Sequence, residues 1–252
     1  MSVTLSDIRE KTLASGLRIV IREDHTTPVA ALNFWVRVGS NNETGDAMGW
    51  SHGIEHMLFK GTDRRPPGAI AREIMNAGGE TNAGTGYETT NYYIVVPSDQ
   101  VETALDIHAD VIRNSMFDPG ELENERQVLI QENKMYRDRP SGYGITWEEL
   151  FRLGFTTHRY RNPIGGPDRN LRETSRETIL RHRDRYYRAS NIVYVIVGDV
   201  DAADMFARVE AAFDGFDGGD TEVDVSPAEP PQTEFRFKEF SGAVNRVYGK
   251  IG

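Results

Sequence analysis

Two histidines and a glutamate near the start of the chain stand in the order His52-x-x-Glu55-His56. This order is the zinc-hydrolase signature read in reverse. On a helix, His52 and His56 lie one turn apart on the same face, so both imidazoles can bind one divalent ion. Glu55 would point its carboxylate into the same space, where it could accept a proton from water. Two nitrogen ligands and one carboxylate suit zinc, so the motif predicts a zinc site of the hydrolytic kind.

The neighbours of the motif favour burial over an ordinary solvated helix face. Apolar side chains flank both of its sides, and a helix that is apolar on both flanks is buried on most sides. Buried imidazoles and a buried carboxylate need partners, which a metal ion would provide. The flanking residues are Trp50, Ile54, Met57, Leu58 and Phe59. Four further histidines show no metal spacing, and we expect His108 and His158 among them to be incidental.

A third ligand is expected on a second helix, which begins near residue 119. Asp118 suits the N-cap of that helix and Pro119 suits its first position. An apolar stripe recurs there every seven residues, and Glu125 and Glu132 interleave with it. A carboxylate inside such a stripe is costly unless it is paired or binds a cation. The alternative is that both glutamates form surface pairs with Arg126 or Lys134.

Longer stretches of the chain resemble the pitrilysin/insulinase-type zinc peptidases, the inverzincins, and most closely their processing-peptidase branch. The resemblance covers roughly residues 9–215. It rests on six segments: Gly49–Thr62, Gly78–Thr85, Thr89–Tyr93, Glu125–Glu132, Asn162–Gly166 and Asn191–Asp199.

The resemblance implies a role for each residue of the predicted site. His52 and His56 would be zinc ligands and Glu55 the general base. Glu132 fits the spacing of the third ligand in this branch. Glu125 matches a second acidic position of the family, where it would support catalysis by holding a ligand or tuning the site. Two nearby acids are less favoured alternatives for the third ligand: Glu121 and Glu123.

A segment rich in small and polar residues, Glu80–Thr85, is the candidate for an exposed strand edge. Such an edge binds an extended peptide through backbone hydrogen bonds. The resemblance implies that Asn82 and Ala83 contact the substrate backbone near the scissile bond. The alternative is an ordinary hairpin strand. Three aromatic residues nearby are expected in the core more than in a substrate pocket: Phe59, Tyr92 and Tyr93.

Composition limits the classes of partner and compartment. The chain has 252 residues, a formal net charge of −10 and no cysteine. The acidic balance argues against nucleic acid as a partner and fits basic peptides. Without cysteine, disulfides, a thiolate nucleophile and thiolate metal sites are excluded. The N-terminal residues lack the apolar core of a secretory signal and no run reaches the length of a membrane span, so we expect no membrane partner and a cytoplasmic location.

Strand and helix patterns mix without strict alternation, which predicts an α+β fold with a mixed, largely antiparallel sheet packed with several helices. Strands are expected at 17–22, 29–38, 80–85, 90–96 and 192–197. Helices are expected at about 50–59, 67–77, 98–114, 119–137, 143–153, 172–189 and 202–213.

The last forty residues differ from the rest. Glycine, proline and acids dominate from about residue 214, and strand-like alternation returns at 234–238 and 243–251. We therefore predict a catalytic pitrilysin-like domain at 1–215, a linker at 216–234, and the beginning of a second, truncated homologous domain at 235–252. Members of the resembled family contain two or four such domains, which implies missing C-terminal domains or a homo- or hetero-oligomer.

The leading expectation is a zinc-dependent metalloendopeptidase that acts on peptides or small unfolded proteins. Full-length members of the resembled family use an arginine–tyrosine pair from a later domain, and no residue here can be assigned to that role. The second expectation is therefore a zinc- or peptide-binding lobe that depends on a partner. A zinc hydrolase that acts on another class of substrate is the third.

Overall fold

The computed structural model describes residues 7–139, 143–216, 218–221, 224–241 and 246–252. Its centre is a six-stranded sheet with the order β1-β2-β6-β3-β5-β4. Only β2 and β6 run parallel; the other four neighbouring pairs are antiparallel. The predicted α+β fold with a mixed, largely antiparallel sheet is confirmed. The strands are β1 (Ile8–Thr12), β2 (Arg18–Glu23), β3 (Val29–Val36), β4 (Glu80–Thr85), β5 (Thr90–Pro97) and β6 (Ile192–Gly198).

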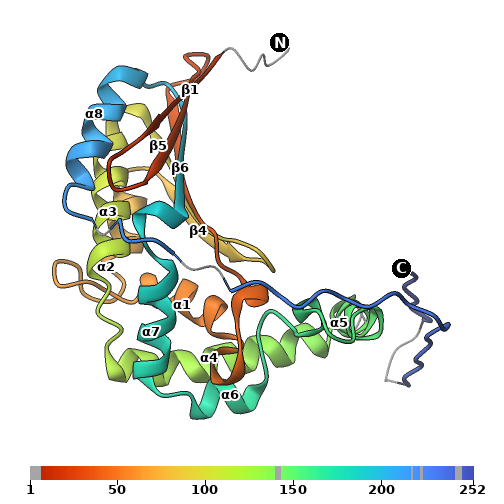
Figure 1. Ribbon diagram of the computed structural model, residues 1–252. Helices are drawn as coiled ribbons and strands as arrows, with labels where there is room; N and C mark the ends of the chain where they lie inside the picture. The colour runs from red at the N-terminus through yellow and green to blue at the C-terminus, as the bar shows by residue number, and fades with distance from the viewer. Residues whose placement is uncertain (1–6, 140–142, 217, 222–223, 242–245) are drawn as a thin grey trace.

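Helices cover one face of the sheet (Figure 1). Along β3, every second side chain from Ala30 to Val36 is fully buried, while the residues between them are partly or largely exposed. Strand β6 alternates in the same way. Because successive side chains of a strand point to opposite faces, the buried set marks the face that packs on α3 (Val101–Asn114) and α8 (Ala202–Ala212).

Two helices meet below the sheet and carry the predicted site. Helix α1 (Trp50–Leu58) lies beside β4 and β5 and packs on α4 (Pro119–Arg137) and α7 (Arg176–Tyr186). Helix α4 begins where its sequence predicts, because Asp118 Oδ1 accepts hydrogen bonds from the backbone N–H groups of Gly120 and Glu121. The remaining helices are α2 (Ala69–Asn76), α5 (Tyr143–Gly154) and α6 (Asp168–Glu173).

Before residue 215, two elements differ from those that the sequence predicts. The single helix expected at 172–189 is two helices, α6 and α7, because Ser175 accepts a hydrogen bond from the Thr178 N–H and starts a new helix. The sequence does not predict strand β1, because its five residues show no apolar alternation; four of them are exposed in the structure. It is an edge strand that pairs with β2 alone.

Beyond α8 the chain runs back across the molecule and then beside α5, which projects from the body as an arm (Figure 1). Arg236 donates to the Leu153 carbonyl at 2.7 Å, and Lys238 Nζ lies 2.5 Å from Glu149 Oε2. The strand expected at 234–238 is absent from this described segment, which has no neighbouring strand to pair with; the one expected at 243–251 lies partly outside the described residues, and 246–251 form none. The division at residues 215 and 234 stays a prediction.

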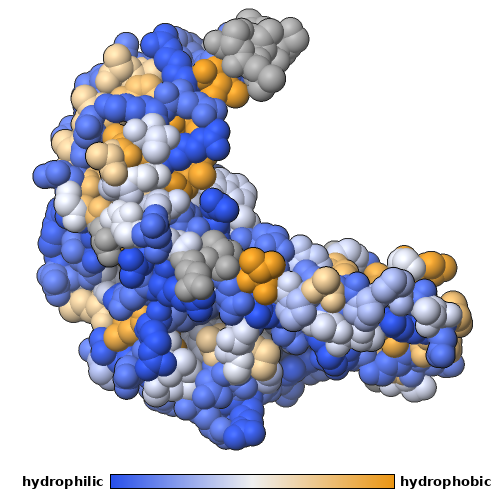
Figure 2. All heavy atoms as spheres, in the orientation of Figure 1, coloured by the Kyte–Doolittle hydropathy of each residue, from blue (hydrophilic) through white to orange (hydrophobic). Residues whose placement is uncertain are grey.

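The surface is hollowed between the sheet and the α5 arm (Figure 2). Within the described parts of the chain, none of the helices is both long enough and apolar enough to span a bilayer.

Candidate metal centre

The N-terminus of α1 is held by a buried carboxylate from the preceding loop. Glu43 Oε2 accepts from the Gly49 N–H and Oε1 accepts from the Ser51 N–H, both at 2.6 Å. Burial raises the pKa of Glu43 to about 7, while the two backbone donors act against that rise. Gly49 has φ +91°, and a Cβ there would lie 2.6 Å from the Gly165 carbonyl oxygen, so this entry to the helix requires glycine. These contacts fix the start of the metal-binding motif.

Helix α7 supports α1 from behind. His182 Nε2 lies 3.1 Å from Ser51 Oγ, which in turn donates to the Gly39 carbonyl. Since Ser51 uses its proton for that carbonyl, His182 Nε2 is the donor to Ser51. Burial lowers the pKa of His182 to about 4, so the ring is neutral.

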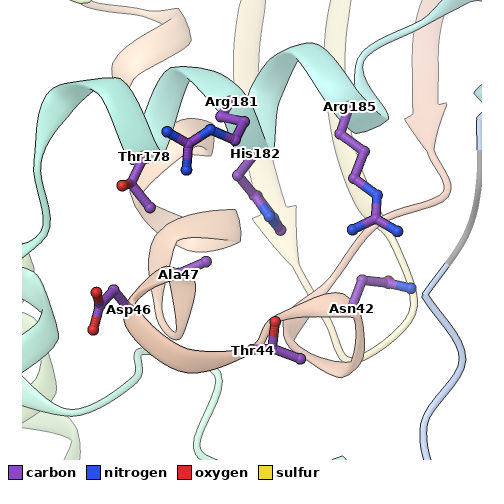
Figure 3. Close-up of a pocket in the computed structure, with 8 residues that line it drawn as sticks. All are labelled: Asn42, Thr44, Asp46, Ala47, Thr178, Arg181, His182 and Arg185. Atoms are coloured by element: carbon purple, nitrogen blue, oxygen red, sulfur yellow. The ribbon is translucent and has the colours of Figure 1, made fainter.

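A cavity of about 260 Å³ opens beside His182 (Figure 3). Neither motif histidine lines it, so it is separate from the candidate metal centre. Its lining residues are Asn42, Thr44, Asp46, Ala47, Thr178, Arg181, His182 and Arg185.

Three predicted ligands converge on one point. His52 Nε2 and His56 Nε2 are 3.1 Å apart, and Glu132 Oε2 lies 3.7 Å from the first and 3.5 Å from the second. Burial lowers the pKa of His52 to about 4, and the neighbouring charge of His56 acts in the same direction. Two imidazole nitrogens facing one carboxylate oxygen are the donor set that zinc prefers, so these residues fit the ion. They form the only such group found among the described residues.

Glu125 lies behind His56, as expected for a residue that holds a ligand. Its Oε1 is 2.7 Å from His56 Nδ1, and its Oε2 is 2.5 Å from Lys60 Nζ. Burial pushes the pKa of Glu125 up, but hydrogen bonds from His56 and Lys60 outweigh it and keep the pKa below its usual value. An ionised carboxylate only accepts, so His56 Nδ1 carries the proton and Nε2 is free for a metal. The surface-pair alternative with Arg126 is wrong, since Arg126 instead pairs with Glu123.

Glu55 is 8% exposed, and its carboxylate accepts a hydrogen bond from Thr85 Oγ1 at 2.5 Å. Burial raises the pKa of Glu55, against the hydrogen bond from Thr85 and the charge of His56. Three neighbours of the site carry no signal of their contacts in the sequence: Thr85, Lys60 and Glu43. Each lies inside or near a segment on which the family resemblance rests, but no local pattern marks the contact that it makes.

Asn82 and Ala83 lie on β4, opposite Tyr93 and Tyr92 of β5. In the described structure no strand pairs with the outer edge of β4. Asn82 is exposed, whereas Ala83 is partly buried and packs against the core. The edge-strand placement is confirmed; contact with a substrate stays a prediction.

The remaining candidates fall elsewhere. His108 is buried with its Nδ1 3.1 Å from the Tyr194 hydroxyl, and the His158 Nδ1 accepts from the Tyr160 N–H. Glu121 and Glu123 do not belong to the three-residue ligand group. Of the three aromatic residues expected in the core, Tyr92 is buried, Phe59 packs partly against the core and Tyr93 is partly exposed.

Two family models match the chain. The model described as insulinase (peptidase family M16) matches residues 18–168, and the model described as the peptidase M16 inactive domain matches residues 174–250. A zinc protease of Bacillus subtilis is 33% identical over 211 residues, which are 83% of this chain and 51% of that protein. A probable mitochondrial-processing peptidase subunit beta of Arabidopsis thaliana is 31% identical over 207 residues, 82% of this chain and 39% of that protein.

The fold matches solved structures as well. A protease from Helicobacter pylori superposes with a TM-score of 0.82 at 23% identity, over 87% of this chain and 54% of that one. The chain thus spans about half the length, or less, of the relatives it matches. Since the insulinase model covers more than half of its residues, the chain belongs to the insulinase family of peptidases, peptidase family M16.

Proposed function

We propose that this chain provides the zinc site of a zinc-dependent endopeptidase that hydrolyses peptides or small unfolded proteins. The observation that carries the proposal is the convergence of His52 Nε2, His56 Nε2 and Glu132 Oε2 beside the buried carboxylate of Glu55. Membership in a peptidase family and relatives named zinc proteases support it.

His52, His56 and Glu132 would hold the ion. When bound, zinc would polarise the scissile carbonyl and lower the pKa of water at the site. Glu55 would take a proton from the attacking water on its carboxylate and pass it to the leaving amine. The burial that raises the pKa of Glu55 makes its carboxylate a stronger base, which suits this role. Glu125 would hold His56 in the tautomer whose Nε2 is free.

The outer edge of β4 would bind the substrate as an added strand, with Asn82 and Ala83 nearest the scissile bond. A net charge of −10 fits basic peptides and does not favour nucleic acid. We propose a cytoplasmic location and no membrane partner.

The second candidate is a zinc- and peptide-binding lobe that turns over only with a partner. It is favoured by a relative that is named as a subunit. Its partner would be further C-terminal domains or another subunit of a homo- or hetero-oligomer. We place the end of the zinc-binding domain at residue 215, the linker at 216–234 and the start of a second domain at 235.

Glu55→Gln separates metal binding from catalysis. The variant should keep its zinc and lose peptide hydrolysis, whereas Glu102→Gln, at an exposed carboxylate on α3, should keep both. Zinc is measured by elemental analysis and hydrolysis with a quenched fluorogenic peptide, with and without candidate partner subunits. If Glu55→Gln cleaves at the wild-type rate, the assignment of the base is wrong; if the wild type cleaves only with a partner, the second candidate function is the correct one.

A further inference from the structure

The general base proposed for this site is held from the substrate-binding strand. Thr85, the last residue of β4, donates its hydroxyl proton to Glu55 Oε2 at 2.5 Å. Within the described ranges, no other hydrogen bond to the Glu55 carboxylate is found. The ligand cluster acts on this carboxylate through charge alone, since His56 attracts it and Glu132 repels it. The Thr85 hydroxyl is therefore the group that gives the carboxylate a defined direction.

Thr85 is itself tightly held. It pairs with Thr90 of β5, whose side chain is buried and donates to the Val38 carbonyl at 2.9 Å. The turn between the two strands is tied to the next segment, since the Ser40 N–H donates to the Gly86 carbonyl at 3.2 Å. That segment leads directly to the loop that holds the start of α1. The strand that carries Thr85 and the helix that carries Glu55 are thus joined by hydrogen bonds to the same connecting segment.

The hydrogen bond also decides which carboxylate oxygen is available. With Oε2 accepting from Thr85, Oε1 of Glu55 is the carboxylate oxygen that keeps both lone pairs for a proton. A glutamate side chain rotates about three bonds, and freezing them in the productive geometry before reaction lowers the barrier. A misplaced base loses rate without losing the metal.

We propose that Thr85 is a positioning residue for Glu55. Through Thr85, strand β4, which would pair with the substrate, also holds the group that moves the proton. The link is short, because Asn82 and Ala83 precede Thr85 by only two or three residues on the same strand. Backbone pairing of a peptide along this edge would hold the strand that carries Thr85. This role of Thr85 rests on the proposed function, which assigns the proton transfer to Glu55 but gives Thr85 no part in it.

Three variants test the proposal. Thr85→Val keeps the shape and removes the hydroxyl, and Thr85→Ser restores the hydroxyl. Thr26→Val is the matched control: Thr26 lies in the exposed loop between β2 and β3 and donates its hydroxyl proton to a carboxylate, Asp24 Oδ1, at 2.6 Å. We expect Thr85→Val to lower kcat by about tenfold to a hundredfold with KM and zinc content unchanged. Thr85→Ser and Thr26→Val should stay near wild type.

A second measurement does not depend on hydrolysis. Crystal structures of the zinc-free proteins should show the Glu55 carboxylate displaced in Thr85→Val, but in its original position in Thr85→Ser and Thr26→Val. A Glu55 carboxylate unmoved in Thr85→Val would overturn the proposal, as would wild-type kcat or loss of zinc in that variant. If the wild type hydrolyses no peptide under any condition, the proposed function fails, while the crystal structures still decide whether Thr85 positions Glu55.

Discussion

Lys60 Nζ lies 2.5 Å from Oε2 of Glu125, the carboxylate oxygen opposite the one that contacts His56. The ammonium group helps to keep Glu125 ionised, so that Glu125 can only accept a hydrogen bond from the N–H group at His56 Nδ1. The charge of Lys60, which contacts Glu125 and not His56, thereby favours the His56 tautomer that is protonated at Nδ1. Partners of this kind contribute to metal affinity although they do not touch the ion.

Glu125→Gln should weaken zinc binding by about tenfold to a hundredfold, because an amide orients His56 less strongly than an ionised carboxylate. The measurement is competition for zinc with a chelator of known affinity. Glu121→Gln, on the first turn of the same helix, is the control and should bind zinc like the wild type. Equal affinity of Glu125→Gln and wild type would contradict the role of Glu125.

Glu132→Gln should reduce zinc affinity further, by about a hundredfold or more, because it removes a ligand and not a supporting group. Metal content after dialysis against buffer with trace zinc gives the result. Glu123→Gln should retain the ion, since the exposed Glu123 pairs with Arg126 and not with the motif histidines. Retention of zinc by Glu132→Gln together with its loss from Glu121→Gln or Glu123→Gln would reassign the third ligand.

Glu43→Ala should lower the free energy of unfolding by about 2–4 kcal/mol, because two buried backbone N–H groups at the start of α1 lose their acceptor. Urea unfolding of the zinc-free protein measures the change. Asp46→Ala, an exposed acid of the same loop, should cost little. Similar losses in the two variants would show that the carboxylate of Glu43 does not stabilise the helix.

Stability should fall as the pH drops below about 6.5, partly because of His108. Burial lowers its pKa to about 3, whereas the unfolded chain has the ordinary value of 6.5, so the unfolded state binds more protons between these two pH values. Each such group removes up to about 1.4 kcal/mol per pH unit in that window and nothing above it.

His108→Gln should therefore show a shallower loss than the wild type between pH 6.5 and 4, measured by urea unfolding at a series of pH values. Arg113→Gln, at an exposed position of the same helix, should follow the wild-type profile. Parallel profiles for His108→Gln and wild type would show that His108 does not titrate as expected.

The sequence predicts most elements and the two histidines of the cluster because their signals are local, whereas the assignment of Glu132 as third ligand rests on the family resemblance. Asp118 and Pro119 mark the start of α4, and the His52–His56 spacing works on any helix. Strand β1 escapes prediction because its pairing with β2, and not its own residues, makes it a strand. The same holds for the Thr85–Glu55 contact, which joins residues 30 apart across a helix and a sheet edge.

The contact between His182 and Ser51 has a consequence for biosynthesis. The motif helix is made early in translation, but its support from α7 comes 131 residues later. A nascent chain that ends before His182 would therefore present both motif histidines on a helix that lacks this contact. We expect the ion to be captured only after this part of the polypeptide has left the ribosome, which makes metal loading a late event in maturation.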